Sequence, residues 1–285
     1  MSRATEIRSK IKSIKSTRKI TSSMEMVAAS KMRKAQESTK ASRPYVEKIR
    51  VVIEHVSRSS TEYQHPYFIE RTPKRVGFLV VSTDRGLCGS LNNNLFKTVV
   101  ESMRQWQNRD IPIEIATIGK KAEHFFSRVG GRVIASVVDL GTAPSILSMI
   151  GTVKVMLDRY ESGAIDRLYF SYNQFINSLR QVPQVDLLLP VLEKNIQKGP
   201  STDYLYEPDP RTLLNALLIR YVETLVYQGV VENVACEQAA RVLAMKNASD
   251  NAAELIDHLG LMYNKARQAS ITQEVSEIIA GASAV

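Results

Sequence analysis

The chain has 285 residues, of which 44% are hydrophobic, and a formal net charge of +9. This composition can fill the core of one or two domains, and no run of 18 consecutive apolar residues predicts a membrane-spanning helix. The two cysteines, Cys88 and Cys236, lie far apart and no secretory signal precedes them, so we expect reduced thiols rather than a disulfide. The four histidines are scattered without the spacing of a metal site.

The positive charge is concentrated in the first 50 residues, which contain 14 Lys or Arg and four Glu. The rest of the chain is therefore close to neutral. Such an imbalance indicates an anionic partner for this segment: nucleic acid, an acidic membrane surface or an acidic loop of another protein.

The N-terminal segment predicts one long helix over residues 2 to about 58. It contains no glycine, and Ile7, Ile11 and Ile14 begin an apolar stripe with helical spacing. Only Pro44 could bend this helix. The stripe is narrow and the opposite face is basic, which is typical of a coiled-coil seam rather than of a helix laid on a broad core.

The C-terminal segment, 209–285, predicts a second long helix. Asp209 offers an N-cap oxygen, Pro210 suits the first helical position, and no proline follows. A helix of about 75 residues would span roughly 110 Å, which exceeds an ordinary globular domain. It must therefore pair with another long helix, and small residues such as Ala28 and Ala239 would let the two terminal helices approach closely.

Strands and helices alternate in the middle of the chain. We expect strands at 76–82, 113–119, 132–138, 167–173 and 181–190, and helices at 92–107, 120–129 and 145–161. This order is typical of a mostly parallel sheet with helices on its faces. The predicted fold class is therefore α/β: a domain at 75–195 is inserted into a long antiparallel coiled coil formed by residues 1–58 and 209–285.

The segment STDRGLCGSLN, residues 82–92, lies where mononucleotide-binding folds hold phosphate. With only Gly86 and Gly89, it fits neither the dinucleotide fingerprint nor the P-loop. Asp84 and Arg85 are more typical of a turn cap or a surface ion pair than of a catalytic pair. We therefore predict a tight turn, and no catalytic, cofactor-binding or metal-binding residues.

Two other functions stay open at this point. The turn would also suit a nucleotide-dependent α/β enzyme with coiled-coil arms, and the basic first helix would suit a nucleic-acid-binding coiled coil, although few aromatic residues accompany it for base stacking. The end of the chain favours a third possibility. A polar patch at 267–274 precedes an apolar tip at 278–285, and such a tip should be buried in another chain.

Four segments resemble the γ subunits of F-type ATP synthases in their bacterial form: ITSSMEMVAASKMRKAQ (20–36), VVSTDRGLCGSLN (80–92), DYLYEPDP (203–210) and NKARQASITQEVSEIIAGASA (264–284). The resemblance covers nearly the whole chain. It implies the central-stalk rotor, a shaft that enters a hexamer of α and β subunits. It also implies that the central domain is Rossmann-like but holds no nucleotide, so that catalysis and cofactors belong to other chains.

The resemblance also implies particular contacts. The residues implied to contact the β subunit are Met24, Lys31, Arg33, Arg267, Gln268, Thr272 and Glu274, and those implied to contact the membrane c ring at the foot are Tyr204, Tyr206 and Glu207. The ε subunit would bind beside the foot. Rotation of the shaft would couple proton flow to ATP synthesis or hydrolysis, and the chain would also be required for assembly and regulation of the catalytic head. The implied location is peripheral, on the cytoplasmic side of the bacterial inner (plasma) membrane, with membrane contact only through partners and no nucleic acid.

Overall fold

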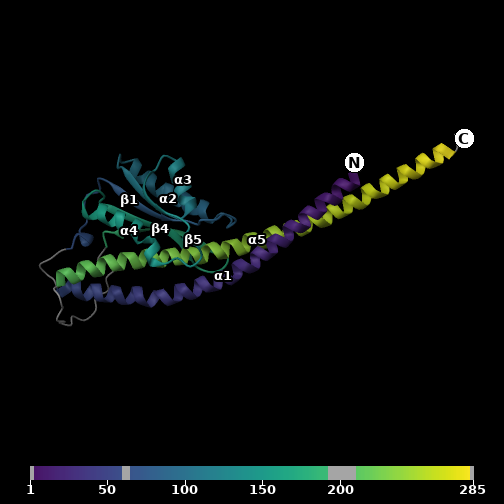
Figure 1. The fold of residues 1–285 in the computed structure, drawn as a ribbon. Coiled ribbons are helices and arrows are strands. Elements are labelled where there is room, and N and C mark those ends of the chain that lie inside the picture. The colour runs from purple at the N-terminus through teal and green to yellow at the C-terminus, as the bar shows by residue number, and fades with distance from the viewer. Residues whose placement is uncertain (1–2, 60–64, 192–209, 283–285) are drawn as a thin grey trace. The chain divides into compact units, whose positions relative to one another are not determined.

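The computed structural model describes residues 3–59, 65–191 and 210–282 (Figure 1). Its contacts divide the chain into two compact units. The terminal unit comprises residues 1–28 and 241–285, and the central unit comprises residues 29–240. Within the described ranges, no helix has a stretch apolar and long enough to cross a bilayer.

Two long helices dominate the secondary structure, as predicted. Helix α1 covers Arg3–Ser59 and helix α5 covers Pro210–Ala282. Pro44 lies inside α1, which continues on both sides of it. The predicted linker at 59–74 contains one element that the sequence did not indicate, the short 3-10 helix η1 (Pro66–Phe68), whose Tyr67 is fully buried.

The central unit contains a five-stranded sheet in the order β3-β2-β1-β4-β5. The strands are β1 (Val76–Val81), β2 (Ile113–Ile118), β3 (Arg132–Val137), β4 (Arg167–Phe175) and β5 (Gln181–Leu189). The first four are parallel, and β5 pairs antiparallel with β4. This arrangement confirms the predicted α/β class with a mostly parallel sheet.

Helices cover both faces of the sheet (Figure 1). The remaining helices are α2 (Leu91–Gln107), α3 (Lys120–Arg128) and α4 (Ile146–Glu161). Because side chains alternate along a strand, Phe78 of β1 packs among residues of α2 and α3, whereas Leu79 packs among residues of α4 and α5. The apolar run predicted as a buried strand is thus buried on both faces, with every residue of β1 inaccessible.

Helix α5 lies along β4 within the central unit. Asn173 of β4 donates a hydrogen bond to Asn233 at 2.9 Å, and its carbonyl accepts one from the Cys236 thiol at 3.3 Å. The buried carboxylate of Glu232 accepts a hydrogen bond from the backbone N–H of Phe175 at 3.0 Å. These polar contacts fix the position of the helix against the carboxyl end of the strand.

Helices α1 and α5 also pair with each other in each unit. In the central unit, Ala35 packs against Val234 and Ala235. In the terminal unit, the hydroxyls of Thr21 and Ser249 share a buried hydrogen bond of 2.6 Å. Small side chains at these contacts bring the backbones close, which confirms the predicted antiparallel pairing of the terminal helices.

Candidate interaction surfaces

The loop after β1 forms the tight strand-to-helix turn predicted for residues 82–92. The Asp84 carboxylate accepts hydrogen bonds from the backbone N–H groups of Lys120, Asp139 and Leu140, at 3.0 to 3.1 Å. Lys120 is the first residue of α3, and the first N–H groups of a helix attract anions. The chain's own carboxylate therefore occupies an anion-binding position beside the turn.

Other polar side chains of the turn bind the first turn of α3 or one another. Ser82 Oγ accepts a hydrogen bond from the N–H of Ala122 at 2.8 Å. The amide of Asn92 donates to Thr83 Oγ1 at 2.8 Å and accepts from the Thr83 N–H at 3.2 Å. The turn is thus held by its own side chains.

The crevice at the carboxyl ends of β1 and β4 is filled by protein side chains. Open α/β sheets bind ligands at such a position, where the strand order reverses. Here Cys88 and Leu91 pack with Cys236 of α5 and with Phe175 at the end of β4. Both cysteines are buried thiols, and burial raises the pKa of the Cys236 thiol. A high pKa together with burial makes this thiol a poor nucleophile.

The substitution Asp84→Ala should destabilise the central unit by about 2 kcal/mol, since hydrogen bonds to a charged group contribute about 1.5–3 kcal/mol. Urea unfolding followed by the fluorescence of Trp106, the single tryptophan, would measure the loss. Glu101→Ala, at an exposed carboxylate on α2, is the control. Equal unfolding midpoints for the two variants would contradict a structural role for the carboxylate of Asp84.

The residues implied to contact the β subunit fall into two groups. Met24 and Lys31 are half-buried on α1 and Arg33 is exposed there. The second group lies on α5, and all four of its members are exposed: Arg267, Gln268, Thr272 and Glu274. The structure does not bring the two groups together within one unit, since Lys31 and Arg33 belong to the central unit and the α5 group to the terminal unit.

Side chains of the α5 group have few partners inside the chain. Thr272 Oγ1 donates to the carbonyl of Gln268 at 3.0 Å, and Glu274 accepts from Ser270 Oγ at 3.3 Å. Within the described residues, the side chains of Arg267 and Gln268 form no hydrogen bond or ion pair. Tyr204, Tyr206 and Glu207, implied to contact the c ring, lie outside the described residues.

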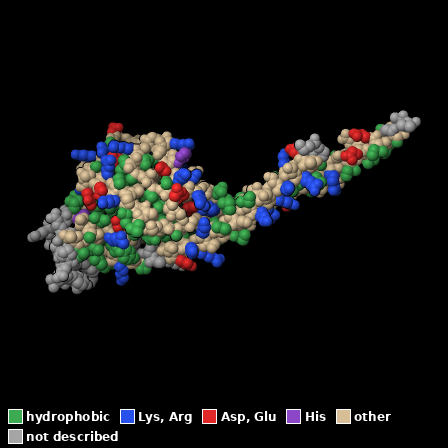
Figure 2. Space-filling model, in the orientation of Figure 1, with side chains coloured by type: hydrophobic (Ala, Val, Ile, Leu, Met, Phe, Trp, Pro, Cys, Tyr) green, Lys and Arg blue, Asp and Glu red, His purple; other side chains and the backbone are tan. Residues whose placement is uncertain are grey.

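The last turns of α5 expose a row of apolar side chains. Ile271, Val275, Ile278 and Ile279 are 48–70% exposed. Ile7, near the start of α1, lies beside Met262 of α5, so the later turns of α5 extend past the first turns of α1. Hydrophobic and acidic side chains are visible on this end of the chain (Figure 2). No segment among the described residues covers the row.

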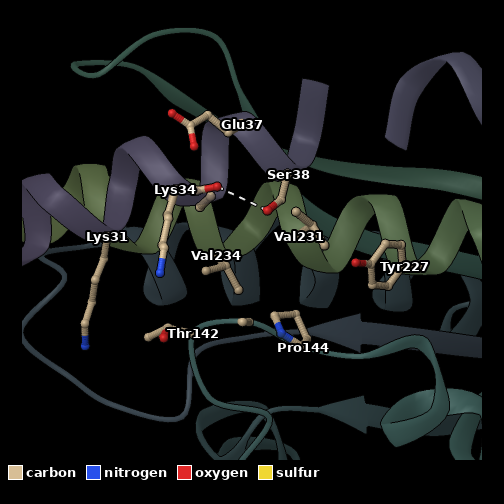
Figure 3. Close-up of a pocket in the computed structure, with 11 residues that line it drawn as sticks. Lys31, Lys34, Glu37, Ser38, Thr142, Pro144, Tyr227, Val231 and Val234 are labelled. Carbon is tan, nitrogen blue, oxygen red and sulfur yellow. Dashed lines mark hydrogen bonds between the residues drawn. The ribbon is translucent and has the colours of Figure 1, made fainter. Parts of the chain in front are cut away.

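Lys31 also lines a cavity of about 310 Å³ in the central unit. Its walls come from α1, α5 and the loop before α4, and include Lys34, Thr142, Pro144, Tyr227, Val231 and Val234. Lys31 and Lys34 extend toward the loop that carries Thr142, whereas Glu37 points the other way (Figure 3). The floor is apolar and its edge is basic, a feature that the sequence did not indicate because the three walls are distant along the chain.

Comparison with known proteins connects these surfaces with one family. The family model described as ATP synthase matches residues 3–285. The ATP synthase gamma chain of Nitrosococcus oceani is 56% identical over 290 residues, covering 100% of both chains.

Solved structures share the fold. The rotor of the Euglena gracilis mitochondrial ATP synthase matches with a TM-score of 0.66 at 19% identity, covering 94% of this chain and 98% of that chain. The central stalk and c ring structure of the Tetrahymena thermophila mitochondrial ATP synthase matches with a TM-score of 0.61 at 25% identity, covering 81% and 99%. The resemblance found in the sequence is confirmed, and the chain belongs to the family of F-type ATP synthase gamma subunits.

Proposed function

We propose that the chain is the central-stalk rotor of a proton-translocating F-type ATP synthase, and that it couples proton flow through the c ring to ATP synthesis or hydrolysis. The exposed apolar row at the end of α5 carries this proposal. These exposed apolar side chains lie on the part of α5 that extends past the start of α1. A row of this kind indicates contact with a surface of another protein. Inside a hexamer of α and β subunits, the row would have such a surface.

The contacts of this shaft are part of the proposal. The β subunit would bind Met24, Lys31, Arg33, Arg267, Gln268, Thr272 and Glu274, and the c ring would bind Tyr204, Tyr206 and Glu207. Exposure of Arg33 and of the α5 group supports the first set, because these side chains are available to another chain. The basic character of α1 supports an acidic partner loop there rather than nucleic acid, given the family of the chain.

The shaft would act by presenting a different surface to each β subunit as it turns. A partner changes conformational state only through contacts that differ between the states. Along the terminal unit, a basic helix lies beside a less charged one, and beyond the start of α1 a single helix continues. Such a shaft is asymmetric about its long axis, which is what coupling three sites in different states requires.

The chain itself would perform no catalysis and hold no cofactor. Asp84 occupies the anion position beside the turn, and Cys236 of α5 helps to fill the crevice where α/β folds bind ligands. ATP chemistry would therefore belong to the β subunits. We divide the chain into coiled-coil helices at 1–58 and 209–285 and a Rossmann-like domain at 75–195, with the ε subunit beside that domain.

The proposed location is peripheral, on the cytoplasmic side of the bacterial inner membrane, with membrane contact only through partners. The chain would also be needed for assembly and regulation of the catalytic head. These assignments follow from the family and from the proposed partners.

Reconstitution with purified partner α and β subunits tests the proposal. We expect one copy of the chain per hexamer by native mass measurement. ATPase activity should rise about tenfold or more, which corresponds to about 1.4 kcal/mol of activation free energy. The control is the same mixture without the chain. Equal assembly and activity in both mixtures would refute the rotor role.

A further inference from the structure

A buried carboxylate in the sheet attracts three arginines. Glu114, the second residue of β2, is 1% exposed. Its Oε1 atom lies 3.2 Å from Arg159 of α4, 3.5 Å from Arg132 of β3 and 3.8 Å from Arg75, which precedes β1. Four different segments thus place these charges together at the amino edge of the sheet. We name Arg75, Arg132 and Arg159 the arginine cluster.

Together with Glu114, the arginine cluster has a net charge of +2. Three guanidinium groups face one carboxylate, and the described residues place no second acidic side chain within 4 Å of them. The neighbouring Asp166 forms no ion pair with these guanidinium groups; its carboxylate accepts hydrogen bonds from the backbone N–H groups of Lys74 and Arg75, at 2.7 and 3.2 Å. The guanidinium groups repel one another, and one carboxylate compensates only part of that repulsion.

The arginine cluster also has side-chain N–H donors that form no hydrogen bond within the described ranges. Among the described residues, only Arg159 donates a hydrogen bond to Glu114. Arg75 and Arg132 lie at ion-pair distance without hydrogen bonding to it, so within the described part of the chain their side-chain N–H groups are not used. Both are open to solvent, with side chains 38% and 64% exposed. Two arginines with available donors and excess charge therefore face the surface.

We propose that the arginine cluster binds a phosphate-type dianion. The two negative charges of such a ligand match the excess of two positive charges. A ligand with one carboxylate would leave one positive charge unmatched. The planar N–H fork of arginine suits phosphate oxygens, which accept two parallel hydrogen bonds from one guanidinium group. Arg75 and Arg132 supply the exposed forks, and Arg159 binds Glu114, the carboxylate with which an added anion competes.

The phosphate could come from solution or from a lipid headgroup. The amino edge of the sheet lies at the same end of the central unit as the start of α5: Tyr67 accepts a hydrogen bond from Val191, just after β5, and the neighbouring His65 binds Asn215 of α5. In the proposed rotor, this end is the foot near the membrane. The lipid source rests on that proposed function, whereas binding of free phosphate does not.

Titration of the full chain with inorganic phosphate is the first test. Calorimetric titration should give saturable binding. At a phosphate concentration of ten times the dissociation constant, the folding equilibrium should shift about 11-fold toward the folded state, relative to sodium chloride of equal ionic strength. Arg132→Gln should weaken binding about tenfold, and Arg75→Gln with Arg132→Gln should abolish it. Glu114→Gln should strengthen binding several-fold in the folded chain, because it removes the competing anion.

Arg104→Gln, at an exposed arginine of α2, is the matched control and should bind phosphate like the wild type. Arg132 is exposed enough that its substitution leaves folding intact, as circular dichroism should show. Equal phosphate affinity in the Arg132→Gln and Arg104→Gln variants would overturn the site.

Sedimentation with vesicles identifies the source. Phosphatidylcholine vesicles with and without phosphatidic acid would be compared for the wild type and the two arginine variants. A loss of binding to the acidic vesicles in Arg132→Gln, but not in Arg104→Gln, supports a lipid phosphate. Equal vesicle binding by all three chains, together with saturable phosphate binding, supports free phosphate. No effect of Arg132→Gln in either assay overturns the proposal, and the reconstitution with α and β subunits is unaffected by that result.

Discussion

Gly229→Ala is expected to destabilise the central unit by about 2 kcal/mol, although alanine is normally the better helix residue by about 1 kcal/mol. Gly229 lies in α5 where the helix crosses β4. A Cβ atom added there would overlap Cε1 of Phe170, and would lie 2.6 Å from Cζ of the same ring and 3.3 Å from Cγ of Tyr172. Distances this short force either the ring or the helix to move.

The ring of Phe170 has little freedom to move. It is buried and stacks on Tyr172, with ring centroids 4.9 Å apart. Helix α5 is equally restrained, since Asn233 binds the side chain of Asn173 in β4 and Cys236 binds the backbone carbonyl of Asn173, one and two turns later. Overpacking of a close-packed interior therefore outweighs the gain in helix propensity.

Gly260→Ala provides the control, because it makes the same substitution in the same helix. No atom lies within 4 Å of a Cβ built at Gly260, so alanine should stabilise the helix there by about 0.5–1 kcal/mol. Urea unfolding followed by Trp106 fluorescence would report on the central unit, and circular dichroism on the helices. If both variants shift the stability in the same direction, the close approach of Phe170 does not explain why position 229 is a glycine.

The two long helices were predictable because their signals are local. The signals are the absence of glycine in the first segment and the proline at the first position of the second helix, and each concerns neighbouring residues only. Asp209, the predicted N-cap, lies outside the described residues. The same holds for β1, whose apolar run reflects burial on both faces. Strand β4 was predicted too short because its last residues, up to Phe175, are held by the antiparallel partner β5, which is a non-local pairing.

Features that depend on distant residues were not predictable from the sequence. Gly229 packs against Phe170, which is 59 residues away in the sequence. A glycine in a helical pattern does not indicate which distant residue it packs against. Asp84 was predicted as a cap or ion pair, but its backbone donors lie after β2 and β3. For Glu114, a partial signal existed: a charged residue inside a buried strand requires partners, and Arg75 and Arg132 stand at the beginnings of two other predicted strands.

Arg267→Ala combined with Gln268→Ala should weaken assembly with α and β subunits, or coupling within the assembled hexamer, by about tenfold or more. Interface hot spots, among which arginine is enriched, cost 2 kcal/mol or more when truncated to alanine. Both side chains are exposed and have no hydrogen bond or ion pair within the described residues, so they are available to a partner chain. ATPase activity and copy number in the reconstituted complex would be measured beside those of the wild type.

The isolated double variant should keep its helix content, because alanine favours helix at least as well as the residues it replaces and no internal contact is lost. A matched variant, Lys246→Ala with Asn247→Ala, removes a cation and an amide from two exposed positions of α5 outside the predicted contact. It should assemble and hydrolyse ATP like the wild type. If the Arg267 and Gln268 variant lost helix content alone in solution, these residues would support the fold, whereas wild-type activity would place the contact with β elsewhere. Loss of function with intact helices, confined to this pair, is the only outcome that assigns Arg267 and Gln268 to the partner, since a general weakening of α5 would affect both variants.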